Sequence, residues 1–364
     1  MNILYLTKLT GNLWAGPNNS VPAQIRAQSK EDNCFWYNLN TVKRDEWATN
    51  GLDCKNINDY PSGRLSDLPA PFNYPDIAIV EETYCWSFQR IIQDLIKQKI
   101  PYIVVPRSTL TKQAQNYKKV KKCIGNILWY NRMIRSAVAI HYLTKEEQTE
   151  SSKRWNSHSF VIPNGITMPG KIQYEPSKNG IKAVYIGRIE IYQKGFDLLI
   201  DALYKVKAKA QEKAFHLDVY GPDREGACQI IDKQLIEKGL QELVTIHESV
   251  FAEEKEEVLR LSDVFIMTSR FEGLPMGLIE ALSYGLPCVA TKGTNLIDVI
   301  EESNAGWVSE NTIDSIANAL ERMINEQDQF DQKSKNARVL ARNYSWTAIA
   351  EQSHKVYAQL LRGD

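Results

Sequence analysis

The sequence predicts an α/β protein with two doubly wound parallel sheets. Three observations lead to this prediction: short β-rich apolar runs alternate with helix-period segments, the alternation stops once at a turn-rich stretch, and it then restarts. A chain of 364 residues is long enough for two sizeable cores. Its 43% hydrophobic and 24% charged residues are ordinary globular values, which excludes a disordered or fibrous chain.

The first half of the chain alternates strands and helices from its start. An apolar stripe at three- and four-residue steps predicts one long helix over 112–136 with its lysines off that stripe; its members are Tyr117, Val120, Ile124, Ile127, Leu128 and Ile134. The expected strands are 3–7, 34–39, 76–80, 102–105, 137–143 and 160–162, and the other expected helices are 19–30 and 87–99.

A turn-rich stretch from Pro163 to Gly180 then interrupts the pattern as a linker would, and the alternation restarts after it. The second half therefore predicts another doubly wound domain. Its expected strands are 182–186, 216–220, 244–247, 264–268 and 287–290, and its expected helices are 196–209, 227–238, 253–261, 276–284 and 296–302.

The formal net charge is zero, from 44 basic and 44 acidic side chains, but the two halves differ. Residues 1–168 hold 21 Lys and Arg against 14 Asp and Glu, a charge of +7, whereas the remainder holds 23 against 30, a charge of −7. Between Leu95 and Lys145 there are 11 basic residues and no acidic one. This stretch is either a solvated helix face or a surface for an anionic partner.

The six cysteines show neither CxxC pairing nor metal-ligand spacing, which predicts reduced, buried thiols. No apolar stretch approaches the roughly 18 residues that a membrane-spanning helix needs. The chain begins directly with a predicted strand rather than a signal sequence. These features predict a cytoplasmic protein and leave a peripheral membrane association open.

The strongest motif, residues 269–281, follows the predicted strand 264–268. A strand end, a glycine-containing loop and a helix opened by a proline direct backbone N–H groups at one point, which predicts an anion site. Glu272 lies in the loop and Glu280 in the first turns of the helix. Their carboxylates could accept hydrogen bonds from sugar or ribose hydroxyls, or could only complement the helix N-terminus.

Two further motifs follow the first strand of each predicted domain. Arg188 and Lys194 emerge from a strand-to-helix loop, where two cations could neutralise a diphosphate leaving group or could be plain surface charges. In the segment 14–22, Gly16 could let the backbone approach a ligand, although an ordinary turn explains it equally well. No G-x-G-x-x-G fingerprint is present.

In this order the three motifs resemble those of the retaining glycosyltransferases of the GT-B fold, family 4 type (group 1), which use nucleotide-diphosphate sugars. Glu272 and Glu280 match the family's E-x7-E motif, and Arg188 with Lys194 matches its Arg and Lys segment. The resemblance covers nearly the whole chain. It implies two Rossmann-like domains facing a central cleft: an acceptor-side domain 1–168 and a nucleotide-sugar domain 169–344, with a final helix 345–362 that packs back on the first.

The resemblance also implies a role for each motif residue. Glu272 would accept hydrogen bonds from hydroxyls of the donor sugar, and Glu280 from those of the ribose. Arg188 and Lys194 would stabilise charge on the departing nucleoside diphosphate, so that Arg188, Lys194 and Glu272 form the catalytic set. The implied donor-binding residues are Gly16, Gly273, Leu274, Met276, Gly277, Leu278 and Glu280.

No Asp-x-Asp occurs and the five histidines are not spaced as ligands, so neither a metal nor another cofactor is expected. His141 lies in an apolar strand and is expected to be a core histidine. After the strand 102–105, where many family members have a histidine, this chain has Arg107, which could contact a phosphate, an anionic sugar or the acceptor.

The resemblance implies a metal-independent, retaining hexosyltransferase that uses a nucleotide sugar. Its acceptor would be a glycan or polyprenyl-linked precursor in capsular, exopolysaccharide or cell-envelope biosynthesis. The basic segment 97–135 is similar to the membrane-facing surface of such enzymes, so an anionic membrane is an expected partner, whereas nucleic acid is not. A GT-B sugar-nucleotide epimerase and a catalytically silent glycosyltransferase-like partner subunit stay open as alternatives.

Overall fold

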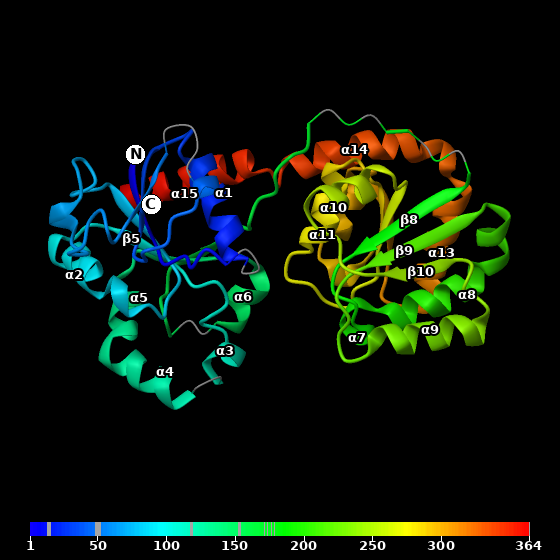
Figure 1. Cartoon of the computed structure of the whole chain (residues 1–364), viewed down its shortest axis with the longest axis horizontal. Coiled ribbons are helices and arrows are strands. Elements are labelled where there is room, and N and C mark those ends of the chain that lie inside the picture. Colours follow the sequence, from blue (N-terminus) through cyan, green and yellow to red (C-terminus); the bar gives the residue numbers. More distant parts are fainter. Residues whose placement is uncertain are drawn as a thin grey trace. The chain divides into compact units, whose positions relative to one another are not determined.

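The computed structural model describes residues 1–12, 16–47, 52–116, 119–151, 154–170, 172, 174–175, 177 and 179–363. The chain forms two compact units (Figure 1). Unit 1 consists of Met1–Gly165 and Trp346–Asp364, and unit 2 consists of Ile166–Ser345. The chain thus passes into unit 2 after Gly165, where the sequence placed the boundary after Met168, and it returns to unit 1 at Trp346.

Unit 1 is built on a parallel sheet whose strand order is β3-β2-β1-β4-β5-β6-β7. Its strands are β1 (Asn2–Thr7), β2 (Asn33–Asn38), β3 (Cys54–Asn56), β4 (Ile77–Glu81), β5 (Tyr102–Val105), β6 (Ala139–Tyr142) and β7 (Ser159–Val161). Its α-helices are α1 (Pro17–Gln28), α2 (Gln89–Gln98), α3 (Lys112–Asn116), α4 (Lys119–Gly125), α5 (Asn131–Ser136), α6 (Lys145–Glu150) and α15 (Trp346–Arg362). β3, a short strand at the edge of the sheet, was not among the strands expected from the sequence.

The strands of unit 1 send alternate side chains to two buried faces, as the two-residue period of a strand requires. Leu4 and Leu6 belong to the core that also contains apolar side chains of α2 and α5. Ile3 and Tyr5 belong to the other core, with side chains of α1 and α15. Helices therefore cover both faces, and α15 lies beside α1 although the two are far apart in the sequence (Figure 1).

The final helix α15 is held on unit 1 by a partly buried polar contact as well as by apolar packing. Its Tyr357 is fully buried. Its His354 Nδ1 lies 3.0 Å from both carboxylate oxygens of Asp32. The ammonium group of Met1 lies 2.8 Å from the same carboxylate.

The prediction of one regular α-helix over 112–136 is wrong, because part of this segment is a π-helix. Residues 112–116 and 119–136 are helical, and residues 117–118 lie outside the described part of the chain. Between α4 and α5, residues Asn126–Tyr130 form a π-helix. A π-helix adds a residue to the turn and so rotates the faces that follow it. The core of unit 1 contains Trp129, Tyr130, Met133 and Ile134. Of the predicted stripe, Ile134 is therefore buried, Tyr117 lies outside the described residues, and the other four members, Val120, Ile124, Ile127 and Leu128, are exposed.

Unit 2 is built on a second parallel sheet, with the order β10-β9-β8-β11-β12-β13. Its strands are β8 (Ile181–Ile186), β9 (Phe215–Tyr220), β10 (Val244–His247), β11 (Val264–Met267), β12 (Cys288–Thr291) and β13 (Gly306–Ser309). Its α-helices are α7 (Ile191–Lys194), α8 (Phe196–Glu212), α9 (Ala227–Lys238), α10 (Ala252–Arg260), α11 (Met276–Ser283), α12 (Ile297–Glu302), α13 (Ile313–Asn325) and α14 (Phe330–Arg342). β13 and the helices α7, α13 and α14 were not among the elements expected from the sequence.

Both sheets are parallel and share one topology, which confirms the predicted α/β class with two Rossmann-like domains. In each sheet the order reverses beside the first strand, between β1 and β4 in unit 1 and between β8 and β11 in unit 2. Ligands of open α/β sheets bind outside the carboxyl ends of the strands at such a reversal. The loops after these four strands are therefore the places to look for a site.

The six cysteines are all free thiols. Cys54, Cys85 and Cys288 are buried, and burial raises the pKa of Cys54 to about 12. Cys123 on α4 is exposed, so the prediction of buried thiols is wrong for this residue. No helix in the described ranges has both the length and the apolar character needed to cross a membrane.

Candidate functional site

Two loops meet at the carboxyl end of the unit 2 sheet because they follow the neighbouring strands β8 and β11. Gly195, just after α7, has a φ of +69°, and a Cβ on it would lie 2.1 Å from the carbonyl oxygen of Thr268. Only glycine allows this approach. The Thr268 hydroxyl in turn lies 3.2 Å from the Lys194 carbonyl oxygen, to which it donates a hydrogen bond.

Lys194 and Glu272, predicted from separate motifs, form an ion pair in which Nζ lies 2.5 Å from Oε1. The Ser269 hydroxyl donates to the same oxygen over 2.6 Å. Both charged side chains are about nine-tenths buried, with 9% and 10% exposed. The structure thus brings the predicted cation and carboxylate together at the reversal point of the sheet.

Arg270 connects the two loops. It was not among the site residues predicted from the sequence. Its guanidinium donates two hydrogen bonds of 2.7 Å to the carboxylate of Asp197. Its backbone N–H donates to the carbonyl of Gln193, and its guanidinium lies 4.6 Å from the ring centroid of Tyr192. A bidentate Arg–carboxylate pair gives a fixed geometry, so this contact holds Lys194 beside Glu272.

Glu280 on α11 is paired with Lys255 of α10. A third of the Glu280 side chain and a quarter of the Lys255 side chain are exposed, so this pair is much more open than the first one. Lys255 was missed because it stands among glutamates in an ordinary charged helix. Nothing local distinguishes it from its neighbours.

The N-terminus of α11 lies against the end of β8. A Cβ on Gly277 would come within 2.9 Å of the Ile186 carbonyl oxygen. The first N–H groups of a helix have no acceptor inside it, which leaves those of Gly277 and Leu278 for another acceptor. The Met276 N–H already donates to the Leu274 carbonyl over 2.9 Å, and Gly273 and Leu274 are half-buried in the preceding loop.

Arg188 lies in the same loop system as Lys194 but in a different environment. Its side chain is exposed, and its backbone carbonyl accepts a hydrogen bond from the Tyr185 hydroxyl. Within the described ranges, no carboxylate pairs with its guanidinium. Its charge is therefore available to a ligand, whereas that of Lys194 is shared with Glu272.

In unit 1, Gly16 immediately precedes α1 and has ordinary right-handed backbone angles. A Cβ there would meet no atom of the described residues within 4 Å, so none of these residues requires glycine at this position. Its expected contact with the donor stays a prediction. Trp14 and Ala15 of the same motif lie outside the described residues, as does Lys118 of the basic segment.

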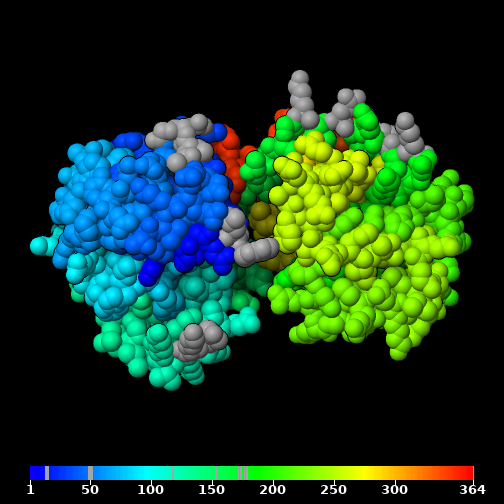
Figure 2. All heavy atoms as spheres, in the orientation of Figure 1, coloured from blue at the N-terminus to red at the C-terminus, as the bar shows by residue number. Residues whose placement is uncertain are grey.

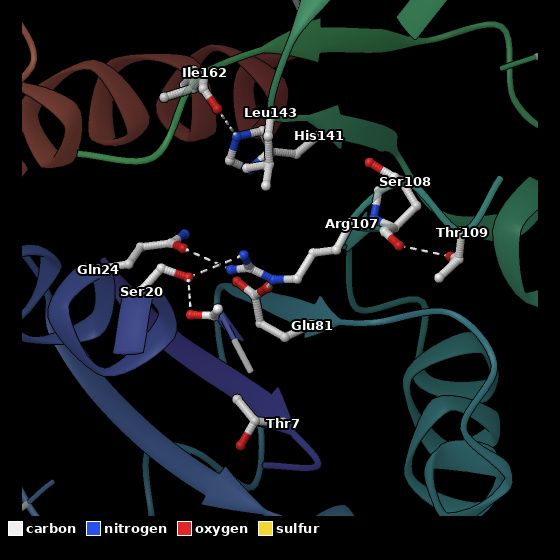
Figure 3. A network of polar contacts seen from close by, with 12 residues as sticks. Thr7, Ser20, Gln24, Glu81, Arg107, Ser108, Thr109, His141, Leu143 and Ile162 are labelled. Atoms are coloured by element: carbon white, nitrogen blue, oxygen red, sulfur yellow. Dashed lines mark hydrogen bonds and ion pairs between the residues drawn. The ribbon is translucent and has the colours of Figure 1, made fainter. Parts of the chain in front are cut away.

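Arg107 follows β5 and is held entirely by groups of unit 1 (Figure 3). Its Nε lies 2.8 Å from Glu81 Oε2, and its terminal nitrogens lie 3.3 Å from the Ser20 hydroxyl and 3.4 Å from Gln24 Oε1. The Arg107 and Glu81 side chains are 8% and 1% exposed. Burial raises the pKa of Glu81, and the neighbouring guanidinium opposes that shift.

The loop that carries Arg107 is conformationally strained. Arg107 and Ser108 have φ values of +49° and +65°, in the left-handed region that non-glycine residues seldom adopt. Glu147 stabilises the loop, because its buried carboxylate accepts hydrogen bonds from the N–H groups of Ser108 and Leu143. Glu82, at the end of β4, has a φ of +85°. Such strain clusters at functional sites, and Glu82, Ser108 and Glu147 gave no sequence signal.

His141 is a core residue, as expected, with its Nε2 lying 2.8 Å from the Ile162 carbonyl oxygen. Burial lowers its pKa to about 4, so the ring is neutral at pH 7. Across the described part of the chain, no group of three or more His, Cys, Asp and Glu side chains is arranged to hold a metal ion.

Residues 180–326, most of unit 2, match the family model described as glycosyl transferases group 1. An uncharacterized glycosyltransferase of Haemophilus influenzae is 28% identical over 58% of this chain and 58% of its own length. The UDP-Gal:alpha-D-GlcNAc-diphosphoundecaprenol alpha-1,3-galactosyltransferase of Escherichia coli is 39% identical over 22% of this chain and 21% of its own length. The structure of HepE from Anabaena in complex with UDP covers 99% of this chain and 100% of its own, with a TM-score of 0.64 and 15% identity.

Proposed function

We propose that the chain is a glycosyltransferase of the group 1 type and that it transfers a hexose, with retention of configuration, from a nucleotide-diphosphate sugar; the family match over unit 2 and the likeness of the fold to HepE support this proposal. The proposed acceptor is a glycan or lipid-linked glycan precursor in capsular, exopolysaccharide or cell-envelope biosynthesis. The single observation that carries the proposal is the contact between Lys194 and Glu272 at the reversal point of the unit 2 sheet. A cation and a carboxylate at that point suit a phosphate and a sugar, respectively.

In the proposed reaction the bond from the anomeric carbon to the diphosphate oxygen breaks, and a bond to the acceptor oxygen forms on the same face of the sugar. The departing diphosphate takes the bonding electrons and also accepts the proton that the acceptor hydroxyl gives up. Arg188 and Lys194 would stabilise the charge that develops on the diphosphate, which is the electrostatic contribution expected of positioned cations. Glu272 would hold a sugar hydroxyl while keeping Lys194 in place.

The start of α11 is the proposed phosphate cradle. Gly277 and Leu278 offer N–H groups that have no acceptor inside the helix, and a helix N-terminus favours a phosphate. Glu280 would accept hydrogen bonds from the ribose hydroxyls and would exchange Lys255 for them, since that pair is partly exposed. The UDP in the HepE structure supports a nucleoside diphosphate as the leaving group.

The acceptor side is proposed to lie at the carboxyl ends of β4 and β5 in unit 1, near Arg107. Its strained loop and buried ion pair support this placement. Because Glu81 neutralises Arg107, the guanidinium would present an oriented donor group and little free charge. The name of the Escherichia coli relative, which includes a diphosphoundecaprenol-linked sugar, supports a polyprenyl-linked acceptor. The cytoplasmic face of a membrane is the proposed place of action.

A thermal-shift screen of nucleoside diphosphates and nucleotide sugars would test the proposal. One nucleotide should raise the melting temperature. At a nucleotide concentration one hundred times its Kd, binding should add about 2.7 kcal/mol to the free energy of unfolding. The matching sugar nucleotide should then be hydrolysed slowly or transferred to an added acceptor. A chain that binds no nucleotide would contradict the donor site, and interconversion of the donor sugar without an acceptor would indicate an epimerase.

We also propose that no metal is needed, because Arg188 and Lys194 would supply the positive charge at the diphosphate. Transfer should persist when a chelator is present in excess over any divalent ion. Loss of activity in the chelator, with recovery on adding one divalent metal, would contradict this part of the mechanism.

A further inference from the structure

The loop after β4 in unit 1 carries a second carboxylate beside the buried Arg107–Glu81 pair. This residue, Glu82, directly follows β4, at the carboxyl end of the sheet where the strand order reverses between β1 and β4. Its side chain is half-buried, and within the described ranges it forms neither a hydrogen bond nor an ion pair. Because ligands of open α/β sheets bind at such a reversal, Glu82 is placed to contact one.

The backbone of Glu82 is strained, and its neighbours hold it in that conformation. Its φ of +85° lies in the left-handed region, which glycine adopts readily and a residue with a Cβ does not. Its N–H donates a hydrogen bond of 3.0 Å to the Val105 carbonyl of β5, and the preceding Glu81 is held by Arg107. A glutamate kept in a conformation that suits glycine indicates a use for its side chain, since such strain gathers at functional sites.

Arg107 itself is turned toward unit 1. Figure 3 shows Glu81 of β4 and Ser20 and Gln24 of α1 directed at its guanidinium. The Arg107 side chain is 8% exposed. Its charge is therefore used within the unit, and the carboxylate of Glu82 is the more accessible group at this end of the sheet.

Lys8 supplies a cation near Glu82. It directly follows β1 and is exposed, and no described carboxylate pairs with it. Figure 2 shows the darkest-blue part of the chain, which contains its first residues, at the surface of unit 1. Burial raises the pKa of the Glu82 carboxyl above its usual value, and the charges of Arg107 and Lys8 oppose that shift. Lys8 is thus near Glu82 without being paired with it.

An exposed aromatic ring follows in the same loop. Trp86 begins the short 3-10 helix Trp86–Phe88 and is 60% exposed. It directly follows Cys85. Burial raises the pKa of the Cys85 thiol, and the charges of Lys8 and Glu82 also act on it. Trp86 therefore adjoins a residue that both charges reach, and an aromatic ring beside a few polar groups is the usual composition of a small-molecule site.

We propose that Glu82 and Lys8 bind a neutral sugar residue of the acceptor, with Trp86 beside its ring. A sugar hydroxyl would donate a hydrogen bond to the Glu82 carboxylate, and a neighbouring hydroxyl would accept one from the Lys8 ammonium group. Trp86 would cover an apolar face of the ring. This inference rests on the proposed function, which supplies the glycan acceptor, and it adds the groups that select the sugar.

Charge favours a neutral sugar over an anionic one. Glu82 is half-buried, so it would repel a carboxylate or phosphate in surroundings that screen charge less than water does. Lys8 is exposed, and solvent weakens its attraction for the same anion. Arg107 offers little compensation, because Glu81 neutralises it. A hydroxyl group meets none of this repulsion.

Saturation-transfer NMR on the full chain tests the site without a transfer reaction. The probes are the methyl glycosides of glucose, galactose and N-acetylglucosamine, with that of glucuronic acid as the anionic probe. At least one neutral glycoside should bind, and the glucuronic acid glycoside should bind at least about tenfold more weakly. Glu82→Gln and Lys8→Met should each raise the Kd of the bound glycoside about tenfold, because each removes a charge-assisted hydrogen bond. Glu31→Gln and Lys30→Met, exposed between α1 and β2 at the opposite edge of the sheet, are the matched controls and should bind like the unaltered chain.

A glycine variant separates binding from structure. Glu82→Gly relieves the backbone strain, so it should lose sugar binding while its melting temperature stays the same or rises. A glutamate with only a structural role would give the opposite result, a lower melting temperature with unchanged sugar binding. If the glycine chain loses both, Glu82→Gln decides, because it keeps the shape of the side chain and changes only its charge.

Three results would overturn the inference: no neutral glycoside binds, Glu82→Gln binds the glycoside as tightly as the unaltered chain, or the glucuronic acid glycoside binds as tightly as the neutral one. The nucleotide-induced rise in melting temperature reports unit 2 and should be unchanged in Glu82→Gln. A chain that binds a glycoside through Glu82 but binds no nucleotide would contradict the proposed function and keep the sugar site. Nucleotide binding together with any of the three results would contradict the sugar site alone.

Discussion

Each unit carries a buried ion pair at the carboxyl end of its sheet, but the two pairs differ in what surrounds them. Arg107 and Glu81 in unit 1 are 8% and 1% exposed, and Ser20 and Gln24 complete the hydrogen bonds of the guanidinium. Lys194 and Glu272 in unit 2 are slightly more exposed, at 9% and 10%. The exposed Arg188, which pairs with no carboxylate in the described part of the chain, lies in the loop after β8 that also leads to Lys194.

The difference shows how one topology serves two purposes. The unit 1 pair is closed, so its main effect is to hold the strained loop of Arg107 in place. The unit 2 pair has available charge beside it at Arg188 and in the partly exposed Glu280–Lys255 pair. Charges that can exchange partners suit a site that binds and releases a diphosphate.

Breaking the closed pair should have the largest effect on stability. Arg107→Met leaves Glu81 buried without its partner, which should cost about 3–5 kcal/mol of unfolding free energy. Since a buried carboxyl is tolerated when neutral, the loss should be smaller at pH 5 than at pH 8. Urea unfolding at both pH values measures it. The double variant Arg107→Met/Glu81→Met should recover most of the loss, and a single variant as stable as the unaltered chain would show that the pair is not structural.

Breaking the unit 2 pair should instead act mainly on turnover. Lys194→Ala should lower kcat by about 10²–10³, because a positioned donor at the leaving group is lost. Steady-state transfer assays with the identified donor measure this effect. Lys205→Ala, which removes an exposed lysine paired with Asp314 in the same unit, is the matched control and should leave kcat unchanged. An unaltered rate for Lys194→Ala would remove this residue from the diphosphate site.

Glu280 should affect nucleotide binding more than turnover. Glu280→Gln weakens a charge-assisted hydrogen bond to the ribose, which should raise the Kd of the nucleoside diphosphate about tenfold. Isothermal titration calorimetry measures this Kd. Glu321→Gln, at an exposed carboxylate paired with Lys209, should have no effect. A tenfold fall in kcat with an unchanged Kd would assign Glu280 to the chemical step instead.

The smallest effect should come from the contact that anchors α15 on unit 1. Burial raises the pKa of Asp32, but hydrogen bonds from the Met1 ammonium, His354 and Gln28 outweigh it and hold that pKa below its usual value. A lowered pKa stabilises the folded state above the unfolded pKa of about 3.9, and the gain is lost as the pH falls through the folded value.

Asp32→Asn should therefore cost about 1–2 kcal/mol near pH 7, and its difference from the unaltered chain should vanish in strong acid. Thermal unfolding across pH measures both. Asp331→Asn, at an exposed carboxylate, should change stability by only about 0.5 kcal/mol. A difference that grows in acid would contradict the lowered pKa.

Local patterns were sufficient to predict most of the sheet and the two loops of the donor site. Strands such as β5 and β10 were predicted at their observed bounds because short apolar runs between turn residues are a local signal. The edge strand β3 was missed because it is short and mostly polar. Most of the apolar stripe was placed correctly in the sequence but not in space, because the spacing of apolar residues does not show which face of a helix packs against the core.

The sequence by itself determined the α/β class, the two-domain organisation and the positions of the glycine- and proline-containing loops, because each depends on periodicity and turn chemistry within a few residues. Only the tertiary structure decided which charge meets which. It paired Arg107 with Glu81, Lys194 with Glu272 and Lys255 with Glu280, and it left four apolar side chains of α4 and the π-helix exposed. These outcomes depend on residues that are distant in the chain and become neighbours only when the sheets form.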